Sequence, residues 1–347
     1  MPHRCDWMLK SPFGLMVHWL PPGPAPKRGE WIRELDRAVD RFDVNAFMED
    51  FLRTGAGWLV FTIGQNTGMY SSPNSVFESM CGNVCSRRDL VMEIAWRVKA
   101  AGKRFIAYLP CEVHTNQRMQ RGLAWSTTPG MDQREFQHRY TKAVSEWSRR
   151  LAELLDGWWF DGCNTWNIFN NKFMDWPLWY TAAREGNPNR AIAFNDGSLG
   201  AGNPRPVHPE CDYLSGETEV LIDGKIRLGR SLDAPVYMPT SRFIEGTECQ
   251  WHSLAPIDAF WAHGAFTVEI GRLPYLARSR FKVLPHDYAG RMESPIYSDA
   301  ELASFLDGVH SVQGAVTFNA GIYQEGILGE KTVEQLQHLS DRFKQKP

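Results

Sequence analysis

Long apolar runs are missing from this sequence of 347 residues. A transmembrane helix needs about 20 consecutive apolar residues, and the longest apolar stretches here fall far short of that. The first ten residues, Met1 to Lys10, contain no apolar core and include Asp6, so they do not have the pattern of a signal peptide. We therefore expect no membrane partner, and a cytoplasmic protein, or a periplasmic or secreted one if a signal segment has been removed.

An excess of charge of one sign is missing as well. The chain has 38 Lys and Arg residues against 40 Asp and Glu residues, a formal net charge of -2, and no run of basic residues. Binding along a phosphate backbone needs a clustered basic field. The composition therefore predicts no nucleic-acid partner.

Cysteine pairs and a glycine-rich phosphate loop are also lacking. The seven cysteines are scattered, and Cys81 and Cys85, the nearest pair, have no second pair that would close a zinc site. Free thiols in a reducing compartment are the expected state. No glycine fingerprint of the dinucleotide-binding type follows the first predicted strand. We predict neither a metal nor any other cofactor.

Tryptophan is unusually frequent, with 14 residues. Tryptophan rings offer flat apolar faces, and the C–H faces of sugars stack on such rings. A tryptophan-rich hydrophobic core is the plainer explanation, and we expect it to account for most of them.

Predicted strands and helices alternate along the chain. The predicted strands are 13–19, 57–63, 104–109, 158–161, 191–195, 213–215 and 315–319, and the predicted helices are 43–54 (with Asp43 as N-cap), 87–101, 132–155, 176–185, 299–309 and 331–343. Residues 235–251 are ambiguous. Alternating β and α units imply a parallel sheet with crossover helices, and about eight strands favour a closed barrel. The predicted fold class is α/β, a single-domain (β/α)8 TIM-like barrel over residues 1–347.

The segment 154–162 carries the clearest functional signal. A helix rich in Glu and Arg runs into a short apolar strand, Trp158 to Asp161, which Gly162 follows at once. In a barrel of parallel strands, a side chain at the C-terminal end of a strand faces the active-site mouth. Asp161 therefore has the position that a catalytic carboxylate needs, although an Asp that only caps the following loop would show the same pattern.

Four segments resemble the α-L-fucosidases of glycoside hydrolase family 29, in the order that the family has them. Residues 13–19 (FGLMVHW) resemble its first barrel strand, and residues 159–162 (WFDG) resemble the strand that carries its nucleophilic Asp. Residues 88–90 (RDL) and 314–319 (GAVTFN) also fit its pattern. The resemblance spans roughly residues 13 to 340. It implies a catalytic barrel in which Asp161 attacks the anomeric carbon of a terminal sugar, α-L-fucose or a related one.

The departures from that family concern the sugar more than the chemistry. Gln65 and Asn66 stand where the family has Lys-His-His-Asp-Gly-Phe, and Leu20 follows Trp19 in place of Gly. The chain also ends at Pro347, without the C-terminal β-sandwich usual in the family. The amides of Gln65 and Asn66 can still hydrogen-bond hydroxyls, but they do not supply imidazole contacts. We therefore expect fold and chemistry to carry over better than fucose specificity.

A retaining glycoside hydrolase needs a second carboxyl group, which acts as the acid/base. Glu217 follows the apolar segment 213–216 and is the preferred candidate. Glu248 precedes residues 249–252, another predicted strand end, and is the second candidate. Glu112, after the third predicted strand, and Glu219, two residues beyond Glu217, are further candidates. For each of these residues, a solvated loop carboxylate remains the alternative.

Other side chains at predicted strand ends are expected to bind the carbohydrate substrate, because a barrel mouth gathers the loops that follow the strands. They are His18, Trp19, Gln65, Asn66, Asn195, Trp251 and His252. A buried, hydrogen-bonded histidine with no contact to substrate is the alternative for His18 and His252.

Two other functions stay open on the sequence. A barrel that binds carbohydrate without turning it over would explain the missing histidine pair. A metal-dependent hydrolase would use His18, His114, Asp161 and His252 as ligands, but no His-X-His pair of the kind usual in barrel metal sites occurs. Homo-oligomer formation is a further open expectation, because a partner subunit would cover the barrel surface that the β-sandwich covers in the family.

Overall fold

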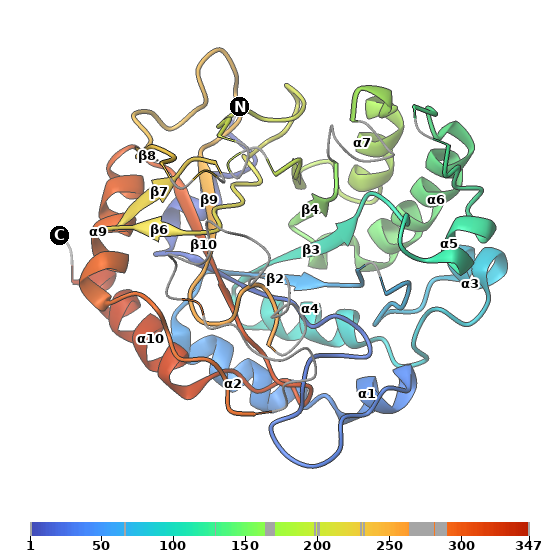
Figure 1. The fold of residues 1–347 in the computed structure, drawn as a ribbon, viewed down its shortest axis with the longest axis horizontal. Helices are drawn as coiled ribbons and strands as arrows, with labels where there is room; N and C mark the ends of the chain where they lie inside the picture. Colours follow the sequence, from blue (N-terminus) through green and yellow to red (C-terminus); the bar gives the residue numbers. More distant parts are fainter. Residues whose placement is uncertain are drawn as a thin grey trace.

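A curled sheet of parallel strands forms the centre of the molecule, and helices surround it (Figure 1). The computed structural model describes residues 2–65, 67–128, 130–163, 171–197, 199, 202–229, 231, 233–263, 281 and 290–345. Seven strands make up the sheet, in the order β5-β4-β3-β2-β1-β10-β9. Their bounds are β1 Gly14–Val17, β2 Trp58–Thr62, β3 Arg104–Pro110, β4 Gly157–Asp161, β5 Ala191–Phe194, β9 His252–Pro256 and β10 Ala315–Ala320.

The segment 212–218 joins the two edge strands of this sheet, β5 and β9. The Asp212 amide donates to the Ile192 carbonyl of β5 (2.9 Å). On the other side, the Thr218 amide donates to the Leu254 carbonyl of β9 (2.7 Å), and the bridges that the segment makes with the chain around β9 are parallel. The segment therefore takes the eighth place in the ring, where the sequence predicted a strand at 213–215. The predicted α/β TIM-like barrel fold is confirmed.

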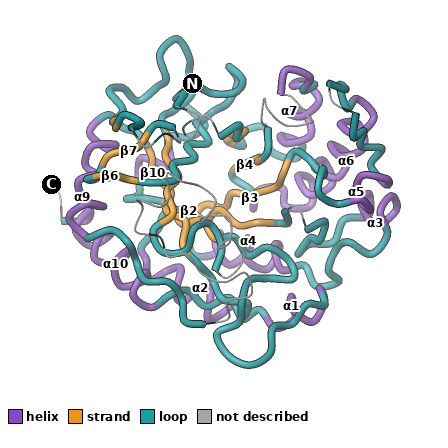
Figure 2. The backbone as a smooth tube through the Cα atoms, viewed as in Figure 1, coloured by secondary structure: helices purple, strands orange, loops and turns teal. Residues whose placement is uncertain are grey.

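Helices cover the outside of the sheet, as the tube in Figure 2 shows. Their bounds are α1 Leu35–Arg41, α2 Val44–Thr54, α3 Ser75–Cys81, α4 Leu90–Ala100, α5 Gln117–Gly122, α6 Arg134–Leu151, α7 Trp176–Arg184, α9 Asp299–Ser311 and α10 Glu330–Lys344, with the 3-10 helices η1 Asp6–Lys10, η2 Ala152–Leu154 and η3 Asn171–Phe173. None of the helices in the described ranges combines the length and the apolar character needed to cross a membrane.

Capping side chains set the helix boundaries. Asp43 is the N-cap of α2, as predicted, and its carboxylate accepts from the amides of Asn45 and Ala46. The predicted helix 87–101 begins later than expected, at Leu90, because the Asp89 carboxylate caps it by accepting from the third amide of the helix.

A small antiparallel sheet lies beside the barrel, in a region where the sequence pattern was ambiguous or showed no element. It consists of β6 Leu221–Ile222, β7 Lys225–Arg227 and β8 Val236–Tyr237. Strands of two or three residues are too short for an alternating pattern to be read from the sequence.

Two hydrophobic layers result from the alternation of side chains along the strands. In β4, Trp159 belongs to the cluster inside the barrel, whereas Trp158 and Phe160 belong to the larger cluster between the sheet and the helices. Tyr108 and Trp58 lie in the inner cluster with Trp159. Most of the tryptophans that the structure describes therefore serve the core, as expected.

Candidate active site

Asp161 lies at the carboxyl end of β4, and polar groups from neighbouring strands converge on its two oxygens. Its Oδ2 accepts hydrogen bonds from the hydroxyl of Tyr108 on β3 and from Nε2 of Gln65 after β2 (3.2 Å to Gln65). Its Oδ1 accepts from Nδ2 of Asn195, the first residue after β5 (2.9 Å). These donors are neutral, and together they hold a half-buried carboxylate in one orientation.

The Asn195 amide joins Asp161 to a second carboxylate. The same Nδ2 donates to Oε2 of Glu217 (2.6 Å), so one NH2 group bridges both acids. Its Oδ1 accepts from the Ser215 hydroxyl (3.0 Å) and from the Gly197 amide (3.0 Å), and this fixes which end of the amide faces the acids. The oxygen of Asp161 and the oxygen of Glu217 are therefore no farther apart than the two bonds combined, about 5.5 Å.

Tyr108 contacts Asp161 from inside the barrel. Its ring is buried inside the barrel and stacks on Trp159, with centroids 5.2 Å apart and planes 14° apart. Burial, together with the charge of Asp161, raises the pKa of Tyr108 well above its ordinary 10.0. The phenol therefore keeps its proton, and its O–H group donates a hydrogen bond to the Asp161 carboxylate.

His18 lies beside this group, after β1. Its Nδ1 is 2.7 Å from Oδ1 of Asn319 on β10. The ring meets Tyr108 edge-on at 5.3 Å and Trp261 at 5.6 Å, between ring centroids. Burial lowers the pKa of His18 from 6.5 to about 4, although the Asn319 hydrogen bond and the Asp161 charge act in the opposite direction. The imidazole is therefore neutral at neutral pH.

Glu112 and His114 form a pair in the loop after β3. The Glu112 carboxylate is buried and accepts from the backbone amide of His114 (2.7 Å) and pairs with the His114 ring. That ring bond raises the pKa of His114. Glu112 lies next to Gly162, since a Cβ added there would be 2.9 Å from its Cγ. Glu112 therefore lies beside Gly162, the residue directly after Asp161.

Several predicted site residues come together here, and others do not. Asp161, Glu217, Gln65, Asn195 and His18 lie at the carboxyl ends of the strands. Trp19 is fully buried in the outer cluster, where its Nε1 donates to the Gln324 carbonyl (3.0 Å). Asn66 lies outside the described residues.

The expectation that residues 249–252, which Glu248 precedes, are the end of a strand is wrong. β9 begins at His252, so these residues lie at the amino end of the strand, the end away from Asp161. The Glu248 carbonyl accepts from His3 near the N-terminus (2.9 Å), and Trp251 is buried against Tyr237. A run of apolar residues shows that a strand is near, but it does not show on which side of a polar residue the strand begins.

His252 is part of the packing inside the barrel. Its Nδ1 faces the carbonyls of Leu214 and Ser215 (2.9 and 3.2 Å), so that nitrogen carries the proton. Its Nε2 is 2.7 Å from the Thr317 hydroxyl, which also accepts from Nε1 of Trp58 (2.9 Å). Burial lowers the pKa of His252 to about 4. The sequence alternative of a satisfied, buried histidine describes this residue.

Three side chains at the site escaped the sequence reading, namely Tyr108, Asn319 and Trp261. Tyr108 and Asn319 lie within predicted strands, and only knowledge of which face points inward would have marked them. Trp261 is half-buried, lies after β9 and has a backbone φ of 67°, in the left-handed region. No pattern around it in the sequence separates it from the other tryptophans.

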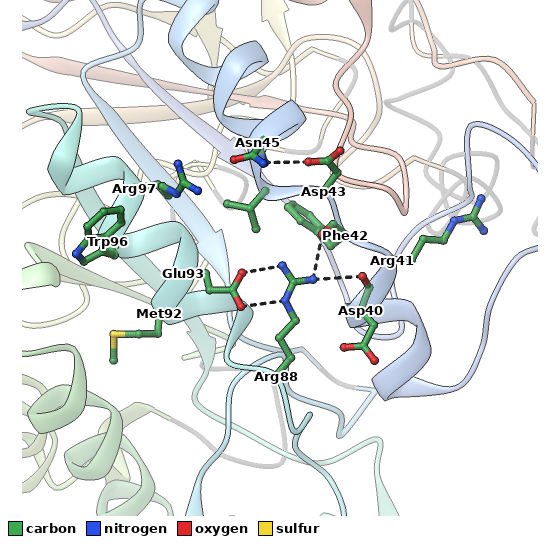
Figure 3. Close-up of a pocket in the computed structure, with 11 residues that line it drawn as sticks. Asp40, Arg41, Phe42, Asp43, Asn45, Arg88, Met92, Glu93, Trp96 and Arg97 are labelled. Atoms are coloured by element: carbon green, nitrogen blue, oxygen red, sulfur yellow. Dashed lines mark hydrogen bonds and ion pairs between the residues drawn. The ribbon is translucent and has the colours of Figure 1, made fainter.

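A wide groove elsewhere on the surface, of about 920 Å³, does not contain these acids (Figure 3). It lies where α2 and α4 meet the end of α1, and Arg88 is one of the residues that line it. The Arg88 guanidinium donates to the carbonyls of Val39 and Phe42 and pairs with Glu93 (2.7 Å). Through these bonds, Arg88 connects the C-terminal end of α1 with α4.

In the ranges that the structure describes, no group of three or more His, Cys, Asp or Glu side chains is arranged to hold a metal ion. Of the four metal ligands that the sequence suggested, His252 is inside the barrel and His18 is hydrogen-bonded to Asn319. The arrangement around Asp161 is instead one of two carboxyl groups bridged by an amide.

Comparison with known proteins places the fold. No family model matches the chain, and no curated protein sequence matches it. Among solved structures, the endo-fucoidan hydrolase P5AFcnA of glycoside hydrolase family 107 superposes with a TM-score of 0.63 at 14% identity, over 99% of this chain and 94% of that one. α-L-Fucosidase isoenzyme 1 from Paenibacillus thiaminolyticus superposes with a TM-score of 0.57 at 16% identity, over 98% and 75%.

This chain corresponds to only part of the length of some of these structural neighbours. The endo-fucoidan hydrolase MfFcnA4_H294Q gives a TM-score of 0.60 at 15% identity over 98% of this chain, which spans 53% of the length of that protein. At these identities the likeness shows the fold. The chain therefore has the barrel fold found in fucosidases and fucoidan hydrolases, as the resemblance of its sequence segments implied.

Proposed function

We propose that this protein is a retaining glycoside hydrolase that releases a terminal sugar, α-L-fucose or a related one, with Asp161 as nucleophile and Glu217 as acid/base. One observation carries the proposal, namely that the Asn195 amide bonds to both carboxylates and limits Oδ1 of Asp161 and Oε2 of Glu217 to a separation of at most about 5.5 Å. Retaining enzymes place their two carboxyl groups about 5–5.5 Å apart, whereas inverting enzymes need more room for a water.

In the first step, an oxygen of Asp161 forms a bond to the anomeric carbon while the glycosidic C–O bond breaks. Glu217 gives its proton to the leaving oxygen. In the second step, water attacks the anomeric carbon, its proton goes to Glu217, and Asp161 is released. Tyr108, Gln65 and Asn195 keep the Asp161 oxygens in place, so the nucleophile is oriented before the substrate arrives.

Sugar contacts in this proposal come from His18, Gln65 and Asn66, with Trp261 as a ring on which the sugar can stack. Asn195, predicted among them, is buried and uses both amide hydrogens on Asp161 and Glu217, so it orients the acids instead. Trp19, Trp251, His252 and Glu248 have no part in it, because the first three are buried in packing and Glu248 precedes the amino end of β9. The activities for which the structural neighbours are named, α-L-fucosidase and endo-fucoidan hydrolase, support a fucose-type sugar.

The test is a hydrolysis screen of aryl α-L-fucosides, other aryl glycosides and sulfated fucans. It compares the wild type with Asp161→Asn and Glu217→Gln, and Glu248→Gln is the matched control at the other end of the barrel. We expect loss of turnover in the first two variants only, and net retention of anomeric configuration in the product.

Full turnover by Asp161→Asn would remove the assignment. Cleavage within sulfated fucans, with no action on aryl fucosides, would replace release of a terminal sugar by cleavage inside a chain. Calorimetric binding of sugar without any product would favour the carbohydrate-binding barrel.

A further inference from the structure

The hydrogen bonds around Asn319 determine where the proton of His18 lies. Nδ2 of Asn319 donates to the backbone carbonyl of Trp261 (2.9 Å), and a carbonyl can only accept. The amide oxygen of Asn319 therefore faces Nδ1 of His18, at 2.7 Å. Because an amide oxygen also can only accept, Nδ1 must carry the hydrogen.

The other ring nitrogen, Nε2, is then without a hydrogen as long as the imidazole is neutral. Burial favours that neutral form strongly, since it lowers the pKa of His18 to about 4. Nε2 makes no hydrogen bond within the part of the chain that the structure describes. It lies on the far side of the ring from Asn319, and the ring borders Tyr108, which holds Asp161.

We propose that Asn319 fixes His18 as the Nδ1–H tautomer, so that Nε2 is a hydrogen-bond acceptor without a hydrogen at the candidate site. Nε2 then selects a sugar whose hydroxyl facing it is free over a sugar that carries a sulfate ester at that hydroxyl. A hydroxyl donates to Nε2. A sulfate ester has only acceptor oxygens and a negative charge, and its oxygens would face a lone pair. Asn319 is a positioning residue in this inference, and His18 is the residue that contacts the ligand.

The charge around the site acts in the same direction. Asp161 and Glu217 both face the shared Asn195 amide, so an anionic substituent would approach two carboxyl groups. The three donors on Asp161 are a phenol and two amides, none of which neutralises it by a full charge. Only the nature of the ligand in this inference rests on the proposed function; the tautomer does not.

The first measurement is long-range ¹H–¹⁵N correlation NMR of the ring nitrogens, at neutral pH, on protein labelled with ¹⁵N-histidine. His18→Gln assigns the signals of His18 by their disappearance. We expect a protonated Nδ1 and an unprotonated Nε2 for His18. An Nε2–H tautomer or a charged imidazole at neutral pH would overturn the inference, whatever the turnover.

Two variants test the role of Asn319. Asn319→Ala removes the acceptor, and both tautomers of His18 should then be seen. Asn319→Asp puts a carboxylate beside Nδ1, which favours the charged imidazole, so Nε2 should gain a hydrogen at a higher pH than in the wild type. Unchanged ring signals in both folded variants would contradict the role of Asn319. If neither variant folds, the wild-type spectrum still decides the tautomer.

Ligand selection is tested by calorimetry on the wild type with L-fucose and its three esters singly sulfated at O2, O3 or O4, which are free sugars without a glycosidic bond to hydrolyse. We expect at least one ester to bind about 100-fold more weakly than fucose, because a site built for a hydroxyl rejects a group that cannot donate. Adding Asn319→Asp should narrow that gap. Equal binding of all four sugars would overturn the selection.

A third result separates this inference from the proposed function. The expected tautomer and selection, together with no hydrolysis of any glycoside by the wild type, would support the inference and remove the enzyme assignment.

Discussion

Arg190 offers a sharp test of how the chain holds the strands that carry the site. Its side chain is completely buried just before β5, and burial lowers its pKa to about 10. All five hydrogens of the guanidinium find backbone carbonyls at the ends of α6, η2 and α7, at 2.6–3.1 Å. These carbonyls belong to Ser148, Ala152, Leu155, Ala183 and Glu185.

Arg190→Met keeps much of the volume and removes every donor. Three of the five carbonyls keep another donor, because Ser148 accepts from the Ala152 amide, Ala152 from the Leu155 amide (3.3 Å) and Ala183 from the Ser148 hydroxyl (3.3 Å). The Leu155 and Glu185 carbonyls lose the hydrogen bond that Arg190 gives them, and a buried polar group left unsatisfied costs about 1–3 kcal/mol. Removing the buried charge recovers part of that cost, so we expect a net loss of about 2–5 kcal/mol in the free energy of unfolding. Urea unfolding followed by circular dichroism measures it.

Two controls make the result specific. Arg190→Lys retains the charge and three donors in place of five, so it should fall between the wild type and Arg190→Met. Arg149→Met removes an exposed arginine whose ion pair with Glu185 spans 3.3 Å, and it should cost less than about 1 kcal/mol. A loss below about 1 kcal/mol for Arg190→Met would refute the reasoning, because the five bonds would then contribute nothing net.

Three further predictions concern the barrel interior and the site. His252 is buried with a pKa of about 4 against an ordinary 6.5, so on acidification the unfolded chain takes up a proton at this residue before the folded chain does. Between about pH 7.5 and 4.5, the free energy of unfolding of the wild type should therefore fall by about 2.5 kcal/mol relative to that of His252→Gln. Urea titrations measure it, and parallel curves of stability against pH would contradict this. Tyr108→Phe removes a hydrogen bond to the Asp161 carboxylate, worth about 1.5–3 kcal/mol, so kcat on a substrate found by the screen should fall about 10- to 100-fold, and an unchanged kcat would count against that role. Gly216→Ala should destabilise the protein by about 3 kcal/mol or more, because φ is 73° and the new Cβ would be 2.2 Å from the His252 carbonyl oxygen. Gly246→Ala has a similar φ of 75° but nothing within 4 Å of the new Cβ, so it should cost about 1–2 kcal/mol. Thermal unfolding measures both losses, and equal losses would refute the steric argument.

The predicted elements that the structure confirms are those whose signals are local. Asp43 caps α2 as predicted, since a capping carboxylate needs only the next three residues. The apolar run that ends in Asp161 and Gly162 forms β4 as expected. The short strands β6 to β8 were missed, because pairs of residues become strands through pairing and not through their own pattern.

The candidate site was predictable in part for a related reason. Asp161, Gln65 and Asn195 follow predicted strands, and parallel strands bring their carboxyl ends to one edge, so sequence position alone indicated that they meet. His252 shows the limit: it is the first residue of β9, and the sequence pattern did not show that a strand begins at this point and does not end there, which places the side chain in the barrel interior and not at the mouth. Asn319 was invisible because its effect on His18 depends on a bond between β10 and the end of β1.

The sequence by itself determined the alternation of strands and helices, the Asp43 cap of α2, and the placement of Asp161 at a strand end, because each depends on residues that are neighbours along the chain. Only the tertiary structure decided that Asn195 bridges Asp161 and Glu217, that Tyr108 points inward beneath them, and that Trp19 and Trp251 belong to the packing. These relations join residues on different strands, and they are fixed by the register and curvature of the sheet, which no stretch of sequence specifies alone.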